Sequence, residues 1–286
     1  MKDQLIDQGY CVLKNVLNQT SLEQIRKLCG VILKGLPKQH RDRNRSQGSL
    51  VLIADYPEFA SLIAHPGIVE AFNTFEFMDP RFSSGYIISK PSLSPALFWH
   101  QDWWGWDDPV SYTEFIAQTF FMIYLTDTET KNGCLRVIPG SHRTSHPIHD
   151  APAAHNEALA KVVDPTNFLY HPQPEEIPVP VKAGDLVVGD ARLLHGTYPN
   201  NSEQERTVIT LWYHPDFGGL PEGMQARIME IFHRRGVDTD LGSEDSRNPD
   251  DWPDSQRDMI APYLPNYRGV TSPHEWNRIP SWNSNG

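Results

Sequence analysis

The spacing of apolar residues along the chain changes near residue 84. Before that point a short strand is predicted over residues 9–13, and Thr20 to Glu23 form a capping sequence for a helix. The apolar residues of this helix recur every three or four positions; they are Leu22, Ile25, Leu28, Ile32 and Leu33. A second, shorter helix is predicted over residues 67–75. The first part of the chain is therefore expected to be mainly helical.

After residue 84 the period becomes two, in runs rich in β-branched and aromatic residues. The predicted strands cover residues 85–88, 116–125, 134–138, 185–188 and 206–214. Tight turns separate them, as at Lys131-Asn132-Gly133. Many short strands joined by such turns are typical of a jelly roll. The predicted fold class is α+β and β-dominated, with a double-stranded β-helix (jelly-roll) core and flanking N-terminal and C-terminal helices.

We expect one domain over residues 1–286. It has a helical N-terminal part (about 1–80), the jelly-roll core (about 84–216), and a helix with an irregular tail (about 220–286). Within the core, residues 142–178 form a long insertion, and such loops are often lids. Three tryptophans are expected to hold the tail against the domain; they are Trp252, Trp276 and Trp282.

Composition excludes several classes of protein. The chain has 25 Lys and Arg against 36 Asp and Glu, a formal net charge of −11, which disfavours a nucleic-acid partner. Its three cysteines are widely spaced and form no CxxC, so they are expected to be buried thiols. No apolar run could span a membrane, and the N-terminus lacks a signal-peptide pattern. We expect a cytoplasmic protein with no membrane partner; the sequence gives no indication of its oligomeric state.

The densest chemical signal lies around His100 and Asp102. Residues i and i+2 of a strand face the same side, so an H-x-D sequence on a strand presents an imidazole and a carboxylate together. By itself this pattern is weak, because a surface histidine beside an aspartate would look the same.

A second signal follows near residue 195. His195 comes after an apolar run, and Arg206 opens the predicted strand 11 positions later, beyond a turn. That spacing predicts adjacent antiparallel strands and one shared pocket. His100, Asp102 and His195 together would form the 2-His-1-carboxylate triad of an iron(II) oxygenase. The Arg206 guanidinium could bind a carboxylate through two hydrogen bonds.

This set of motifs resembles the phytanoyl-CoA dioxygenase family of iron(II)- and 2-oxoglutarate-dependent oxygenases. The matching segments, which span about residues 9–214, are Lys90-Pro91, His100-Gln101-Asp102, residues 131–143, Gly184-Asp185, His195-Gly196-Thr197 and Arg206. The resemblance implies that His100, Asp102 and His195 hold iron. It also implies that Arg206 and Thr197 bind the distal carboxylate of 2-oxoglutarate, with Gln101 and Tyr86 at further cosubstrate positions.

The chain departs from the family pattern beside this site. Met122 stands where the family often has a tryptophan, so the cosubstrate wall must be built differently. Gln118 faces the same side by the period of two and could supply a polar contact, or it could be an ordinary core amide. Trp103 and Trp104 follow the metal-ligand motif directly and, with Met122, are candidates to line the substrate pocket, although a core role is equally open.

The predicted function is an iron(II)- and 2-oxoglutarate-dependent dioxygenase that uses O2 and releases succinate and CO2. Hydroxylation of an unactivated C–H bond is the expected outcome, on a small or medium apolar metabolite. A CoA ester is disfavoured because its phosphates would be repelled by a chain of net charge −11. Two alternatives remain open at this point: a non-catalytic jelly-roll protein that binds a metabolite, and a cupin-type metal hydrolase or isomerase.

Overall fold

The computed structural model describes residues 1–151, 157–233 and 248–282. Its larger sheet has six strands, and neighbouring strands pair antiparallel in the order β1-β8-β5-β10-β3-β2. These strands are β1 (Tyr10–Leu13), β2 (Val51–Leu52), β3 (Arg81–Lys90), β5 (Thr119–Tyr124), β8 (Leu186–Asp190) and β10 (Arg206–His214). The two outermost strands come from the N-terminal part of the chain, so that part completes the sheet as well as covering it.

The smaller sheet has four antiparallel strands in the order β4-β9-β6-β7. Its strands are β4 (Leu97–His100), β6 (Leu135–Val137), β7 (Ile177–Val179) and β9 (His195–Thr197). The two sheets face each other, which confirms the predicted β-dominated α+β fold with a jelly-roll core. Within the described residues the two sheets remain separate and do not close into a barrel.

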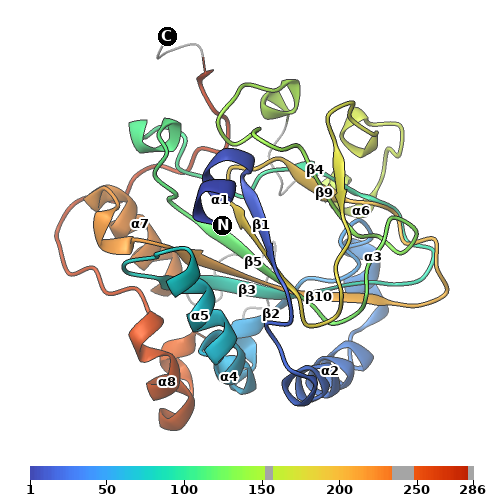
Figure 1. The fold of residues 1–286 in the computed structure, drawn as a ribbon, viewed down its shortest axis with the longest axis horizontal. Coiled ribbons are helices and arrows are strands. Elements are labelled where there is room, and N and C mark those ends of the chain that lie inside the picture. Colours follow the sequence, from blue (N-terminus) through green and yellow to red (C-terminus); the bar gives the residue numbers. More distant parts are fainter. Residues whose placement is uncertain (152–156, 234–247, 283–286) are drawn as a thin grey trace.

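Period-two alternation in β5 explains how the layers pack. Phe121 and Ile123 point to the outer face of the large sheet, while Phe120, Met122 and Tyr124 point inward against the small sheet. Helices α2 (Gln19–Lys34), α4 (Ala60–Ile63) and α5 (Pro66–Thr74) cover the outer face (Figure 1). The inner face is left for the apolar core and the site described below.

Several helices differ from the sequence prediction. Helix α2 begins earlier than expected, because its N-cap is Asn18 and not Thr20; the Asn18 side chain accepts a hydrogen bond from the Ser21 N–H. Three short helices were not predicted in the N-terminal part; they are α1 (Lys2–Gln8), α3 (Lys38–Arg43) and α4. The tail is not irregular throughout, since it contains α8 (Asp254–Ile260) after the predicted helix α7 (Glu222–His233).

The predicted lid segment falls partly outside the described residues, at 152–156. Its described parts include the short helix α6 (Glu157–Lys161). Ile148, Leu159 and Leu169 pack against β4 in one apolar cluster. The three cysteines are buried free thiols, as predicted. Among the described residues no helix has the length and apolar character needed to cross a membrane.

Candidate iron and 2-oxoglutarate site

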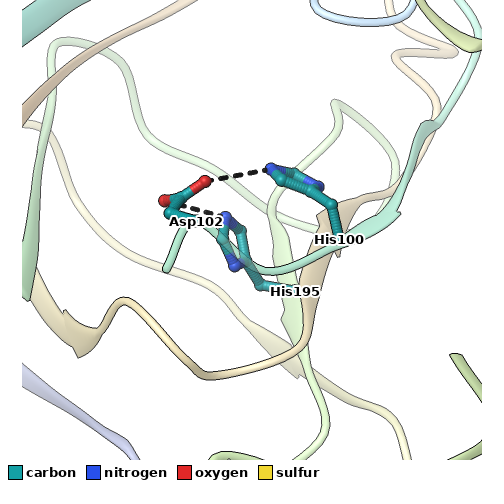
Figure 2. A group of neighbouring side chains, drawn as sticks. All are labelled: His100, Asp102 and His195. Atoms are coloured by element: carbon teal, nitrogen blue, oxygen red, sulfur yellow. Dashed lines mark ion pairs between the residues drawn. The ribbon is translucent and has the colours of Figure 1, made fainter. Parts of the chain in front are cut away.

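Three side chains of metal-ligand type meet at the edge of the small sheet (Figure 2). His100 ends β4 and His195 begins β9, and the two residues are partners in the register of this strand pair. Asp102 lies in the loop just beyond β4, where its N–H donates to the Ala191 carbonyl at 2.7 Å. The H-x-D motif is therefore not held by strand alternation as expected; the loop turns the aspartate back toward both histidines.

The distances are those of a metal site whose ligands share one centre. One potential ligand atom from each residue lies within 4.8 Å of the others. Nε2 of His100 is 3.6 Å from Oδ1 of Asp102, and Nε2 of His195 is 3.8 Å from Oδ2. Among the described residues this is the one cluster of three or more such side chains. Two imidazoles and one carboxylate form the facial triad of non-heme iron(II) oxygenases.

Backbone carbonyls orient both imidazoles. Nδ1 of His100 lies 3.0 Å from the Phe98 carbonyl, and Nδ1 of His195 lies 3.0 Å from the Leu193 carbonyl. A carbonyl accepts only from a protonated nitrogen, so each Nδ1 carries a hydrogen, and in the neutral imidazole Nε2 keeps its lone pair. Both lone pairs face the aspartate, which is the arrangement a metal ligand requires.

Burial and neighbouring charge set the protonation of this site. Burial, together with the nearby His195, lowers the pKa of His100 to about 3. Burial alone would raise the pKa of Asp102, but the two histidines and a hydrogen bond from Trp212 outweigh it and lower that pKa. At neutral pH His100 is a neutral imidazole and Asp102 a carboxylate, and these are the forms that bind metal.

A narrow cavity extends from His195 between the two sheets. Its lining includes Thr197 and Arg206, and also Met122 from β5. Arg206 is buried, and its Nε and Nη2 have no hydrogen-bond partner. A buried guanidinium with open donors is costly unless an anion completes it. The cavity therefore fits the distal carboxylate of 2-oxoglutarate, and the adjacent triad fits iron(II).

The route by which Arg206 reaches this cavity differs from the prediction. His195 and Arg206 do not lie on adjacent paired strands: β9 belongs to the small sheet and β10 to the large one. The turn between them crosses from one sheet to the other, so the two side chains approach across the interior of the sandwich. Both residues line one cavity, as the spacing predicted, but the expected pairing of their strands is wrong.

The remaining predicted cosubstrate residues lie outside this lining. Gln101 is buried, and its amide Nε2 donates to the Arg278 carbonyl at 2.8 Å. Tyr86 packs edge-on against Trp212, with ring centroids 5.9 Å apart. Gln118 is buried just before β5, where its backbone carbonyl accepts from Ala191.

The two candidate substrate tryptophans differ in their surroundings. Trp103 is fully buried, and its indole N–H donates to Ser111 at 2.8 Å. Trp104 stacks on Trp276 of the C-terminal tail, with centroids 5.2 Å and planes 8° apart. Thus the second indole contacts the surface layer of the protein, whereas the first lies in the core.

Two residues near the site were not singled out for a role. Lys90 appeared above only within a family motif, yet it is fully buried, lines the same cavity and pairs with Arg206 in the β3–β10 register. Trp212 donates its indole N–H to Oδ2 of Asp102 at 2.9 Å. Period-two alternation from Arg206 along β10 could have placed Trp212 on the inner face.

Comparison with known sequences agrees with this geometry. The sequence pattern of the family described as phytanoyl-CoA dioxygenase (PhyH) matches residues 6–208, which is more than half of the chain. The chain belongs to the phytanoyl-CoA dioxygenase family. This confirms the resemblance inferred from the motifs.

Curated relatives in this family are distant. The chain is 29% identical over 161 residues to phytanoyl-CoA dioxygenase 1 of Oryza sativa subsp. japonica, covering 54% of this chain and 52% of the relative. It thus spans about half the length of that protein. It is 24% identical over 224 residues to a probable alpha-ketoglutarate-dependent hypophosphite dioxygenase of Stutzerimonas stutzeri, covering 73% of this chain and 75% of the relative.

Solved structures with a similar fold include an alpha ketoglutarate dependent enzyme and a protein with 2-oxoglutarate bound. The carbocyclase SnoK from nogalamycin biosynthesis has a TM-score of 0.55 and 23% identity, covering 74% of this chain and 82% of its own. HygX from Streptomyces hygroscopicus, solved with nickel and 2-oxoglutarate, has a TM-score of 0.55 and 19% identity, covering 75% and 87%. At these identities the likeness describes the fold.

Proposed function

We propose that this protein is an iron(II)- and 2-oxoglutarate-dependent dioxygenase that hydroxylates an unactivated C–H bond of a small or medium-sized metabolite. One observation carries the proposal. The buried guanidinium of Arg206 has open donors in a cavity that continues from a 2-His-1-carboxylate cluster. A metal site alone would need no buried guanidinium. A dicarboxylate cosubstrate needs both the metal and a cation for its distal carboxylate.

Each residue has a role that follows from its position. His100, Asp102 and His195 would hold the metal, with Nε2 and the carboxylate as donors. Arg206 and Thr197 would bind the distal carboxylate of 2-oxoglutarate, and Met122 would close the cavity wall on the apolar side. When bound, iron(II) supplies the capacity to activate O2 at the expense of the cosubstrate, which leaves as succinate and CO2.

The surroundings favour a metabolite over a CoA ester. The chain has a net charge of −11, and a CoA ester would bring several phosphate charges to it. The loop that follows Asp102 carries three buried indoles, those of Trp103, Trp104 and Trp106. An apolar substrate held near Asp102 would lie beside this aromatic loop.

Arg206 also separates this proposal from its alternatives. A cupin-type hydrolase or isomerase would use the same metal ligands, but it would give no function to a buried cation in the adjoining cavity. A non-catalytic metabolite-binding protein would not need the two imidazoles oriented with Nε2 toward one carboxylate.

The decisive experiment is anaerobic addition of iron(II), then 2-oxoglutarate, to the metal-free protein while the weak visible charge-transfer band of the chelate is recorded. Asp102→Ala should abolish iron binding. Arg206→Ala should bind iron but need at least 100-fold more 2-oxoglutarate. Arg268→Ala, which alters an exposed arginine of the tail, should behave like the wild type. Metal binding without a band would reject the oxygenase and favour the hydrolase; no metal binding would favour the binding protein.

A further inference from the structure

The inner face of the large sheet connects the metal-ligand cluster to the buried Arg206. Inward-facing residues of β10 and β5 form three successive cross-strand pairs on this face; they are Val208–Tyr124, Thr210–Met122 and Trp212–Phe120. Residues that alternate along a strand point to the same side of the sheet, so all three pairs face the small sheet. The pairs therefore divide the interior of the sandwich into a first, a middle and a last level.

The last level lies at the metal end of the site. The ring of Phe120 lies 4.8 Å from the ring of His195, measured between centroids. Its partner Trp212 donates its indole N–H to Asp102. Each residue of this pair thus contacts one of the three side chains that would hold the metal.

The first level lies at the cationic end. The guanidinium carbon of Arg206 is 6.0 Å from the centroid of the Tyr124 ring, so the arginine side chain leans along β10 toward the metal. In the proposed function this guanidinium and the iron would hold the two ends of 2-oxoglutarate. The carbon chain of the cosubstrate would then cross the middle level, which Thr210 and Met122 form.

Thr210 brings an unbonded hydroxyl to this middle level. The residue is fully buried and lines the same cavity as His195 and Arg206. Its Oγ1 has no hydrogen-bond partner. A buried hydroxyl without a partner destabilises a fold, and a valine would fill almost the same space without that cost. The hydroxyl is therefore better explained by a ligand than by packing.

The neighbours of Thr210 across the sheet do not provide an equivalent donor. On one side is Met122, whose thioether has no proton to donate and lies 3.8 Å from the Tyr124 hydroxyl. On the other side is Tyr86, which packs against Trp212 and does not line the cavity. At the middle level, the hydrogen-bond donor that faces the cavity is the hydroxyl of Thr210.

We propose that Thr210 is a further cosubstrate-binding residue, whose hydroxyl donates a hydrogen bond to the oxo-acid end of 2-oxoglutarate. Arg206 would bind the distal carboxylate, so the oxygens left for a donor nearer the metal are those of the 2-oxo group and the C1 carboxylate. A hydrogen bond to such a charged group is stronger than one between neutral groups. This inference rests on the proposed function and adds to it that β10 binds both ends of the cosubstrate.

The test compares Thr210→Val and Thr210→Ser with the wild type, each as the full chain. Iron(II) is loaded without oxygen and 2-oxoglutarate is titrated, while the intensity and wavelength of the chelate band are recorded. Thr210→Val should need about 10-fold more 2-oxoglutarate, the cost of one such hydrogen bond. Its band should also move to shorter wavelength, because the oxo acid that accepts the electron loses a hydrogen bond. Thr210→Ser keeps the donor and should stay close to the wild type in both measurements.

Urea unfolding of the metal-free protein provides a second readout with the opposite sign. Thr210→Val should be at least as stable as the wild type, because it removes an unbonded hydroxyl from the core. Thr207→Val is the matched control on the other face of β10, where the hydroxyl is bonded to Ser89 at 2.7 Å. This control should lose stability and leave the chelate band unchanged.

Two results would overturn the inference. One is a Thr210→Val chelate with the affinity and wavelength of the wild type. The other is a loss of stability in Thr210→Val equal to that in Thr207→Val, since the hydroxyl would then serve the fold. Absence of the band in the wild type would instead reject the proposed oxygenase.

Discussion

The indole N–H of Trp212 donates a 2.9 Å hydrogen bond to Oδ2 of Asp102, the carboxylate that His195 Nε2 faces at 3.8 Å. This bond fixes the rotamer of the one anionic group in the metal cluster. The same bond connects the large sheet to the metal-ligand cluster, whose other members lie on the small sheet and whose aspartate lies in the loop after β4. Arg206 and Trp212 lie at opposite ends of the inner face of β10, so one strand positions both halves of the site.

Trp212→Phe should weaken metal binding by about 10- to 100-fold, because ligands that lose an outer hydrogen bond bind metal less tightly. The contact with Tyr86 is kept by the phenyl ring, so the fold should survive. Trp252→Phe is the matched control, since it removes a similar indole bond, to the Ala54 carbonyl, far from the metal. Titration with iron(II) measures the effect; equal losses in the two variants would show that Trp212 has no special role.

Lys90→Met should lower the affinity for 2-oxoglutarate about 10-fold at pH 7, because a buried positive charge beside Arg206 attracts the dianion. Burial, with Arg206 and Arg136 nearby, holds the Lys90 pKa well below its ordinary value. Binding of the anion favours the protonated lysine, so wild-type affinity should fall as pH rises, and this fall should be smaller in the variant. Lys182→Met, at an exposed lysine, is the control. If the affinity of Lys90→Met for 2-oxoglutarate fell with rising pH as much as that of the wild type, Lys90 would not be the group responsible.

Arg192→Met should destabilise the fold by about 3–5 kcal/mol, because it leaves the buried carboxylate of Asp190 without its partner. Arg192 also donates to three backbone carbonyls of the loop before β5, which would lose their donors. Urea unfolding measures the loss. The double variant Asp190→Asn with Arg192→Met should recover part of it; a double variant no more stable than Arg192→Met would show that the loop contacts, and not the ion pair, matter most.

Acid should unfold the protein partly through His214. Burial lowers the pKa of this histidine to about 4, and its Nδ1 donates to the Ala117 carbonyl. Between about pH 6.5 and pH 4 the unfolded chain binds a proton that the folded chain does not, so stability falls as pH falls. His214→Asn should reduce this slope by up to one proton, whereas His171→Asn, at an exposed histidine, should not. Urea unfolding at pH 7, 6 and 5 measures both; equal slopes would contradict the prediction.

Local sequence patterns were sufficient to predict the elements with the clearest period and the residues with the clearest chemistry. The strand predicted over residues 206–214 is β10 to the residue, because alternation at period two is a local property of the chain. His100, Asp102 and His195 could be named as one cluster because their residue types and motifs are local as well, and the structure brings them within 4.8 Å.

How these residues meet depends on the packing of distant segments. This packing placed His195 and Arg206 in different sheets, which no spacing along the chain could show, because the turn between β9 and β10 changes sheet. It also brought Arg278 to a loop 177 positions away in sequence, through a hydrogen bond with Gln101. Contacts of this kind depend on packing between distant segments, and no periodic pattern in the tail predicts them.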